Sequence, residues 1–307
     1  MQPLPIHLPS GNLLADRRFE WARDLAAKGD LAAAADLLMQ AIELAPSYAA
    51  AWFSLGELRE KLGHRDGAIA AFAQARAADP QDRHGAALHL IRLGAEPIAA
   101  MPESYVRTLF DGYAPAFDQA LRQGLGYRAP ELLLRALEAS GARMKFGSAL
   151  DLGCGTGLAG AAFRQHCDWL VGVDLSPAML AQARAKGLYD RLAEGDVAAF
   201  LASEAAAQAR YHLIVAADVF MYLDALTPVL TAAAQVLAPS ATIAFSVETH
   251  DGDGVMLCET LRYAHGAAHV RTALDAAGLQ LVSLDSVATR TEKNVPVPSL
   301  IVVANLS

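Results

Sequence analysis

A glycine-rich loop in the second half of the chain is the strongest sign of chemistry. Its residues read Asp151-Leu-Gly-Cys-Gly-Thr-Gly157, and an apolar stretch precedes them. Glycines let a backbone approach a ligand closely, and a helix that follows such a loop offers free amide groups. The loop is therefore expected to bind a nucleotide, a dinucleotide or a nucleoside that carries an amino-acid group.

The residues in and around this loop distinguish between these three classes of ligand. A triphosphate loop would end in Gly-Lys-Ser/Thr, whereas this one continues Gly157-Leu-Ala-Gly160, which excludes that class. Gly155, Gly157 and Gly160 satisfy the dinucleotide pattern, and Asp174 follows at a distance suited to a ribose, so a nicotinamide enzyme stays open. Asp151 argues against it, because a carboxylate there would repel a pyrophosphate and attract an ammonium group.

Short apolar stretches alternate with helix-like segments around this loop. The stretches are 148–152, 169–175, a weaker one around Leu192, 211–218, 241–248, 279–284 and 299–305. This alternation predicts an open, mainly parallel sheet with helices on both faces, which binds its ligand at the carboxyl ends of the strands. We expect the last two stretches to form an antiparallel hairpin, and residues 256–278 to be helical.

The first part of the chain contains an internal repeat. Pro46 and Pro80 lie 34 residues apart, and each ends a similar phrase, 30–46 and 65–80. The second copy has residues at the offsets of a tetratricopeptide repeat: Trp52, Leu55, Gly56, Ala68, Phe72, Ala75 and Pro80. Residues 13–96 thus resemble a helical tetratricopeptide-repeat domain, with 84–93 as half of a further repeat. Such a domain would bind a protein partner, mediate self-association or only pack.

Four motifs in the second half occur in a fixed order, and each lies at the end of a predicted strand. They are Asp151–Gly157, Val171–Met179, Glu194–Asp196 and Ala216–Val219. Together they resemble class I methyltransferases that depend on S-adenosylmethionine, and the resemblance covers residues 103–307. It implies an α/β, Rossmann-like sheet, mainly parallel with an antiparallel last strand.

Two further segments narrow this resemblance. Phe110–Asp118 and Tyr127–Pro130, with the preceding repeats, are similar to a bacterial branch of methyltransferases that carries N-terminal tetratricopeptide repeats. That branch is similar to ubiquinone-biosynthesis and Williams–Beuren-region methyltransferases. The implied cofactor is S-adenosylmethionine, and the implied product is S-adenosylhomocysteine.

The resemblance also implies which residues surround the cofactor. Asp151 would hold the methionine ammonium, and Asp174 would accept both ribose hydroxyls. The positions implied against the methionine and sugar are Gly153, Gly155 and Thr156, with Ala217 and Asp218 at the methionine end. The positions implied around the adenine are Leu175, Ser176, Met179, Asp196 and Val197. Each aspartate has a simpler alternative role, which is to cap the N-terminus of a helix.

The segment 104–120 is expected to fold over the cofactor. Tyr113 or Phe117 would cover the sulfonium, since a cation gains energy at an aromatic face, although both rings could serve only for packing. Arg128 would bind the cofactor carboxylate or cap an edge of the sheet.

Methyl transfer to a hydroxyl or an ammonium requires a base. Glu248 and His265 are the preferred candidates for acceptor-site catalytic residues; His265 has a purely structural alternative, since it lies in a segment predicted to be helical. The primary hypothesis is an enzyme that methylates oxygen or nitrogen of a small molecule. Two alternatives remain: methylation of a protein recruited by the repeats, and a cofactor-binding module without catalysis.

Composition restricts the partners further. The 307 residues carry a net charge of −8, which argues against nucleic acid, as does Ala-Asp-Val-Phe where a base-modifying enzyme would have a Pro-Pro motif. Cys154, Cys167 and Cys258 form no CxxC pair, so no metal site is expected and a cytoplasmic location is predicted. No apolar stretch is long enough to span a membrane.

Overall fold

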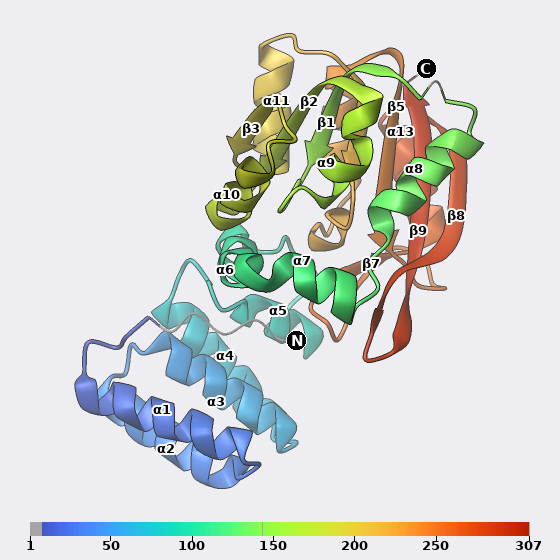
Figure 1. Ribbon diagram of the computed structural model, residues 1–307. Coiled ribbons are helices and arrows are strands. Elements are labelled where there is room, and N and C mark those ends of the chain that lie inside the picture. Colours follow the sequence, from blue (N-terminus) through green and yellow to red (C-terminus); the bar gives the residue numbers. More distant parts are fainter. Residues whose placement is uncertain (1–7, 143, 307) are drawn as a thin grey trace. The chain divides into compact units, whose positions relative to one another are not determined.

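The computed structural model describes residues 8–142 and 144–306. Within these residues the chain divides into two compact units, with the boundary between Leu109 and Phe110 (Figure 1). The first unit is entirely helical and the second is built around a large sheet. Each unit has its own hydrophobic core.

The first unit consists of helices that follow one another over short turns. They are α1 (Leu13–Ala27), α2 (Leu31–Leu44), α3 (Ala49–Lys61), α4 (Arg65–Ala78) and α5 (Ala86–Arg92). Leu55 and Phe72 are buried between α3 and α4, as the repeat pattern predicts. The first copy differs, because Trp21 is 58% exposed at the position aligned with Leu55. Phe19 is buried instead, two residues earlier on α1.

The second unit begins within α6 (Glu103–Tyr113) and continues through several short helical turns. These are η1 (Ala114–Ala116), α7 (Phe117–Gln119) and η2 (Ala120–Gly124), and α8 (Ala129–Ala139) follows. The first strands and helices of the sheet are β1 (Phe146–Leu152), α9 (Leu158–Phe163), η3 (Arg164–His166), β2 (Cys167–Asp174), α10 (Pro177–Lys186), β3 (Arg191–Glu194) and α11 (Val197–Ala206). The remaining elements are β4 (Tyr211–Ala216), η4 (Phe220–Tyr222), α12 (Thr227–Val236), β5 (Leu237–Glu248), β6 (Val255–Leu257), β7 (Tyr263–His265), α13 (Ala267–Ala276), β8 (Leu279–Glu292) and β9 (Val295–Leu306).

The described residues form one nine-stranded sheet with the order β3-β2-β1-β4-β5-β7-β6, and β9 pairs with both β5 and β8. Strands β1 to β5 run parallel, whereas β9 is antiparallel to β5 and to β8. The predicted α/β sheet and the predicted hairpin at 279–305 are thus confirmed. Parallel pairing places the ends of β1, β2 and β4 at one edge of the sheet.

One prediction within this unit is wrong. The segment 256–278 is not one helix, because 255–257 and 263–265 form the short strands β6 and β7, and α13 begins only at Ala267. Tyr263 and Ala264 are buried against the sheet, and Ala264 pairs with Glu248. Tertiary pairing therefore overrides the local helical composition.

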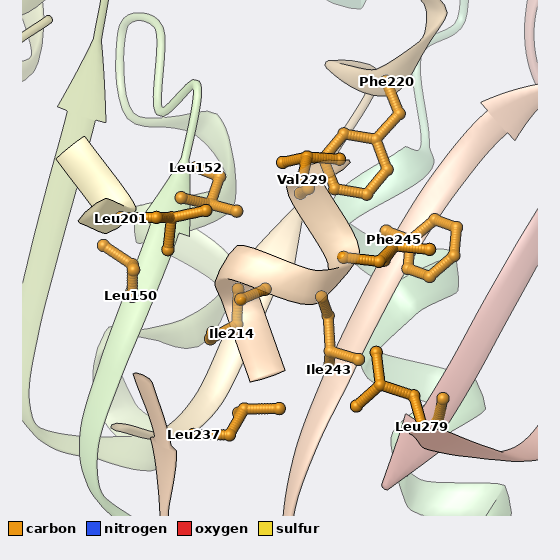
Figure 2. Packing of buried hydrophobic residues seen from close by; sticks show 14 of the residues in the cluster. Leu150, Leu152, Leu201, Ile214, Phe220, Val229, Leu237, Ile243, Phe245 and Leu279 are labelled. Atoms are coloured by element: carbon orange, nitrogen blue, oxygen red, sulfur yellow. The ribbon is translucent and has the colours of Figure 1, made fainter. Parts of the chain in front are cut away.

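Two layers of apolar side chains hold helices against the sheet. Successive strand residues point to opposite faces, so Leu150 and Leu152 pack on one face while Ala149 packs on the other. Figure 2 shows the first layer, where Leu150, Ile214 and Ile243 from neighbouring strands meet Leu201 from α11. These layers fix the strand ends that carry the functional residues.

Candidate active site

Asp151 is the most deeply buried carboxyl group at the strand edge. It lies in β1, is 1% exposed, and accepts a hydrogen bond of 2.6 Å from the Tyr189 hydroxyl at Oδ2. Its other oxygen, Oδ1, has no hydrogen-bond partner among the described residues. Burial, opposed by the hydrogen bond from Tyr189 and assisted by the nearby Asp174 carboxylate, raises the pKa of Asp151 to about 7. A buried carboxylate with a free oxygen is suited to hold a cation.

The position of the Tyr189 ring explains why residue 160, the last of the three glycines in the dinucleotide pattern, is a glycine. A Cβ atom at Gly160 would lie 2.4 Å from the Tyr189 hydroxyl oxygen, so only glycine leaves room for this ring. Burial raises the pKa of Tyr189, and the Asp151 carboxylate adds to that effect. The hydroxyl therefore stays protonated and acts as the donor in its bond to Asp151.

Asp174 ends β2 beside the same loop. Its Oδ2 accepts from the Gly155 amide and its Oδ1 accepts from the Ser176 amide, each at 2.8 Å. Burial raises the pKa of this carboxyl, and the two amides work against that rise. Each oxygen keeps a second lone pair, so the carboxylate can accept two further hydrogen bonds from a pair of hydroxyls.

The loop after β4 lies directly against the glycine loop. Asp218 has a φ of +57°, a left-handed conformation that is unfavourable for a residue with a side chain. Its amide donates to Ser246 Oγ at 2.8 Å, and the same Oγ donates to Asp218 Oδ1 at 2.8 Å. The adjoining Val219 packs on Gly153, where a Cβ atom would lie 2.5 Å from Val219 Cγ2. Gly153 has a φ of +62° and is needed for both reasons.

A segment of aromatic and acidic residues, 110–118, contacts this edge through two carboxylates. Asp111 accepts from Ser176 Oγ at 2.5 Å and from the Ala178 amide at 3.3 Å. Asp118 accepts from Thr156 Oγ1 and pairs with Lys186 at 2.5 Å. Both carboxylates thus hold residues of the predicted cofactor site.

The aromatic rings of this segment form a cluster. Phe117 makes edge contacts with Phe110 and Tyr113, with ring centroids 6.1 and 6.3 Å apart. A Cβ atom at Gly155 would lie 3.9 Å from the Phe117 ring, so this ring covers the glycine loop. Burial raises the pKa of Tyr113, and the Glu292 carboxylate adds to that effect.

The other predicted cofactor residues lie at helix starts and at the ends of strands. Ser176 and Asp196 cap the helices α10 and α11, and Asp196 Oδ1 accepts from the Ala198 and Ala199 amides at 2.8 and 2.9 Å. The residues that line the ends of β2, β3 and β4 beside them are Leu175, Met179, Val197 and Ala217. Arg128 is exposed at the start of α8, and its amide donates to Thr289 O at 2.8 Å.

Glu248, at the end of β5, belongs to a buried network of ion pairs. Its Oε1 accepts from Arg262 Nε at 2.6 Å and from Arg290. Arg290 also pairs with Asp218 at 2.6 Å and with Glu292 at 3.0 Å. Burial works against the charge of Arg290, but these carboxylates outweigh it and raise its pKa. Oε1 of Glu248 already accepts from two guanidinium groups, so the geometry favours an anchoring role over that of a catalytic base.

His265 lies in β7 rather than on the predicted helix, and it is fully buried. Its Nε2 is 3.1 Å from the Leu223 carbonyl oxygen, and its ring stacks on His269 at 5.5 Å. Burial and, to a smaller extent, the neighbouring His269 lower the pKa of His265 to about 4. This low pKa makes the imidazole a weak proton acceptor, and its ring is fully enclosed, so the geometry favours a structural role over that of a base.

A cleft of about 230 Å³ opens where β5 ends. Glu248 pairs with Ala264 on one side and with Ser299 on the other, so β7 and β9 continue as the two walls of the cleft. Its lining is Glu248, Thr249, Cys258, Thr260, Arg262, Ala264, Glu292 and 295–298. The Thr249 amide donates to Pro298 O at 3.0 Å, which places Pro298 and Pro296 toward the gap that β5 leaves.

Several residues of this edge carry no local signal in the sequence. Tyr189, Ser246 and Arg290 are far along the chain from the residues that they hold, and none belongs to a recognisable motif. Asp111 and Asp118 lie within the aromatic segment that the sequence singled out, and their carboxylates could have been suspected from it.

With this geometry in place, the comparisons with known proteins define the class. Residues 150–243 match the family model described as a methyltransferase domain, and residues 25–90 match the tetratricopeptide repeat. The chain thus carries a Rossmann-like domain that matches the methyltransferase family model, preceded by helices that match tetratricopeptide repeats, as the sequence predicts. The narrower likeness to one bacterial branch stays a prediction.

Three particular proteins resemble parts of this chain. The chain is 45% identical to human methyltransferase-like protein 27 over 85 residues, which cover 27% of this chain and 34% of that protein. It thus spans about a third of the length of the curated relative that it matches. A 1,6-didemethyltoxoflavin N1-methyltransferase from Burkholderia thailandensis has a similar fold, with a TM-score of 0.53 and 20% identity over 69% of this chain and 92% of that one. NodS from Bradyrhizobium japonicum matches with a TM-score of 0.45 and 23% identity over 58% and 85%.

Residues 8–142 and 144–306 contain neither a side-chain cluster suited to a metal ion nor a helix suited to a membrane. No group of three or more histidine, cysteine, aspartate or glutamate side chains is placed to hold a metal ion there. No helix in the same residues is both long and apolar enough to cross a bilayer.

Proposed function

We propose that this chain is an S-adenosylmethionine-dependent methyltransferase that acts on oxygen or nitrogen of a small molecule. The single observation that carries the proposal is the buried Asp151 carboxylate, whose Oδ1 has no partner among the described residues. It lies beside the glycine loop of a methyltransferase domain. A dinucleotide would bring a pyrophosphate to this position, which the carboxylate would repel.

The other residues of the edge fit the remaining parts of the cofactor. Asp174 would accept the ribose hydroxyls, and Asp196 with the Val197 amide would meet the adenine. The Phe117 ring would cover the sulfonium, because a cation gains about 0.5–2 kcal/mol at an aromatic face. The Asp218 loop would close the methionine end.

S-adenosylmethionine supplies an electrophilic methyl group at its sulfonium sulfur. The chain would contribute alignment and exclusion of water, which account for much of the acceleration in group transfer. Segment 110–118 suits this task, since Asp111 and Asp118 fix its aromatic cluster over the glycine loop.

The cleft beyond β5 supports a small-molecule acceptor over an extended peptide. A peptide that entered the gap as a strand would need amide donors on both walls. Pro296 and Pro298 have no N–H group, and the Pro298 carbonyl already accepts from the Thr249 amide, so the β9 wall offers no amide donor to such a strand. Val295, Pro296 and Val297 give the cleft an apolar side, which suits a molecule with an apolar body.

Calorimetric titration of the full chain with S-adenosylhomocysteine tests the cofactor. Binding by the wild type, and its loss in Asp174→Ala, is the expected result. Binding of NAD with displacement of S-adenosylhomocysteine by NAD, or no binding of S-adenosylhomocysteine to folded protein, would reject the proposal.

A methyl-labelled cofactor tests the acceptor class. The chain would be incubated with the labelled cofactor and a panel of apolar amines and phenols, and the products separated by mass. Transfer to a small molecule is expected. Label that appears only in added protein would contradict the small-molecule acceptor while leaving the cofactor assignment intact.

A further inference from the structure

Arg290 is the centre of a buried network of ion pairs, and it belongs to none of the sequence motifs. It lies near the end of β8, its side chain is 5% exposed, and its guanidinium reaches three carboxylates. Its Nη1 donates to Asp218 Oδ2 at 2.6 Å and its Nε to Glu292 at 3.0 Å, while Nη2 donates to Glu248. Nη2 also lies 3.9 Å from the sulfur of Met221.

The contact with Asp218 links Arg290 to the glycine loop through the neighbouring Val219. Asp218 has a positive φ, which costs conformational energy that its neighbours must offset. Ser246 holds Oδ1 and the amide, and Arg290 holds Oδ2, so every polar group of the side chain is fixed. Val219 follows at once in the chain and packs on Gly153.

We propose that Arg290 is a positioning residue for the methionine end of the cofactor. It acts through Asp218 and Val219, which it keeps against Gly153, and it does not touch the cofactor itself. This inference rests on the proposed function, because it assumes that the edge binds S-adenosylmethionine. It adds a residue from the C-terminal hairpin to a site that the motifs place wholly within residues 110–219.

Arg262 provides a matched control within the same network. It contacts Glu248 and Glu292, as Arg290 does, with its Nε 2.6 Å from Glu248. Among the described ion pairs, however, Arg290 supplies the guanidinium that reaches Asp218. Arg290→Gln and Arg262→Gln each remove one buried guanidinium, but only the first change releases Asp218.

Two ligands locate the effect along the cofactor. S-adenosylhomocysteine contains the amino-acid end, whereas 5′-methylthioadenosine lacks it and keeps the adenosine. Calorimetric titration should show that Arg290→Gln weakens S-adenosylhomocysteine about tenfold or more, the effect of losing a charged hydrogen bond, and changes methylthioadenosine less than about twofold. Arg262→Gln should leave both affinities within about twofold of the wild type.

Asp218→Asn examines the same pair from the other side and serves if Arg290→Gln does not fold, as judged by circular dichroism. It should reproduce the selective loss of S-adenosylhomocysteine, and the double variant should be no weaker than the stronger single one. Equal losses for both ligands, or equal losses in the Arg290 and Arg262 variants, would overturn the inference. A wild type that binds neither ligand would instead reject the proposed function, and the inference with it.

Discussion

The hydroxyl of Tyr189 donates a 2.6 Å hydrogen bond to Oδ2 of Asp151 and leaves Oδ1 of that carboxylate without a partner among the described residues. The pair connects the end of β1 with the turn that follows α10, 38 residues further along the chain. Tyr189 thereby orients a buried acid whose ionisation is costly. Its ionisation becomes favourable when a cation arrives beside Oδ1.

The pKa of Asp151 predicts that cofactor binding depends on pH. Since that pKa is about 7, most of the carboxyl is protonated at pH 6 and must lose its proton to hold an ammonium. The affinity for S-adenosylhomocysteine should therefore rise about fivefold from pH 6 to pH 7, reach about tenfold at pH 8 and level off above that. Calorimetry in buffers of different ionisation enthalpy would measure the released proton. An equal pH dependence in Asp151→Asn would assign the titration to another group.

The raised pKa of Asp151 also predicts that removing its charge has opposite effects on the stability of the protein and on its affinity for the cofactor. Its pKa in the folded chain exceeds the ordinary value of 3.8, so the folded state holds a proton that the unfolded state releases between about pH 4 and 7. The free energy of unfolding thus falls as the pH rises through this range. Asp151→Asn should stabilise the ligand-free protein at pH 8, by at most about 4 kcal/mol, and abolish tight binding. Urea denaturation of both proteins at pH 5 and pH 8 measures the free energy of unfolding. A variant that is less stable than the wild type at pH 8 would contradict the prediction.

Asp174 should contribute to the affinity for the adenosyl end of the ligand, whereas Arg290 should contribute to the affinity for its amino-acid end. Asp174→Asn is expected to weaken S-adenosylhomocysteine and 5′-methylthioadenosine alike, by about 10–100-fold, since both lose charged hydrogen bonds to the ribose. Asp168→Asn is the control on the same strand, because Asp168 is exposed and pairs with Lys145 at 3.2 Å. Unchanged methylthioadenosine affinity in Asp174→Asn would contradict the ribose assignment.

Phe117 should distinguish the charged cofactor from its neutral product. If its ring covers the sulfonium, Phe117→Leu lowers the affinity for S-adenosylmethionine by about 2–30-fold and that for S-adenosylhomocysteine much less. Phe110→Leu removes a ring of the same cluster, 6.1 Å from Phe117, and should change both affinities equally. Competition between the two ligands measures the ratio of their affinities directly. The same ratio in Phe117→Leu and Phe110→Leu would show that Phe117 serves only for packing.

The repeat unit permits a test that is independent of the cofactor. A Cβ atom at Gly56 would lie 2.6 Å from the Phe72 ring, so Gly56→Ala should destabilise the unit by about 1–3 kcal/mol. Gly67→Ala meets only the flexible Arg59 side chain, at 3.1 Å, and should be nearly neutral. Trp21 and Trp52 report unfolding of this unit in a Trp169→Phe background. Equal stability of the two variants would contradict the close packing of α3 on α4.

The strand ends were predictable because their signal is local. Asp151 and Asp174 follow apolar stretches and precede helix starts, so sequence alone places them at one edge of a parallel sheet. The strands β6 and β7 were missed because three-residue strands show no periodicity and an alanine-rich helix follows them. His265 was misplaced for the same reason.

The residues that hold the site together were not predictable in this way. Tyr189 and Arg290 are ordinary members of their own segments, and each acquires its role from a partner 38 or 72 residues away. Glu248 was singled out correctly as a polar residue at a strand end, but its two arginine partners lie just before β7 and on β8. Only the assembled sheet shows that its charge is already compensated.

The C-terminal hairpin also affects when the site becomes complete. During translation Asp218 leaves the ribosome well before Arg290, which is made 72 residues later, and β9 must then pair with β5 to bring β8 into place. A nascent polypeptide that has formed β1 to β4 still lacks the guanidinium that secures the turn after β4. With the role proposed for Arg290, full affinity for the cofactor develops only once the C-terminal hairpin has joined the sheet.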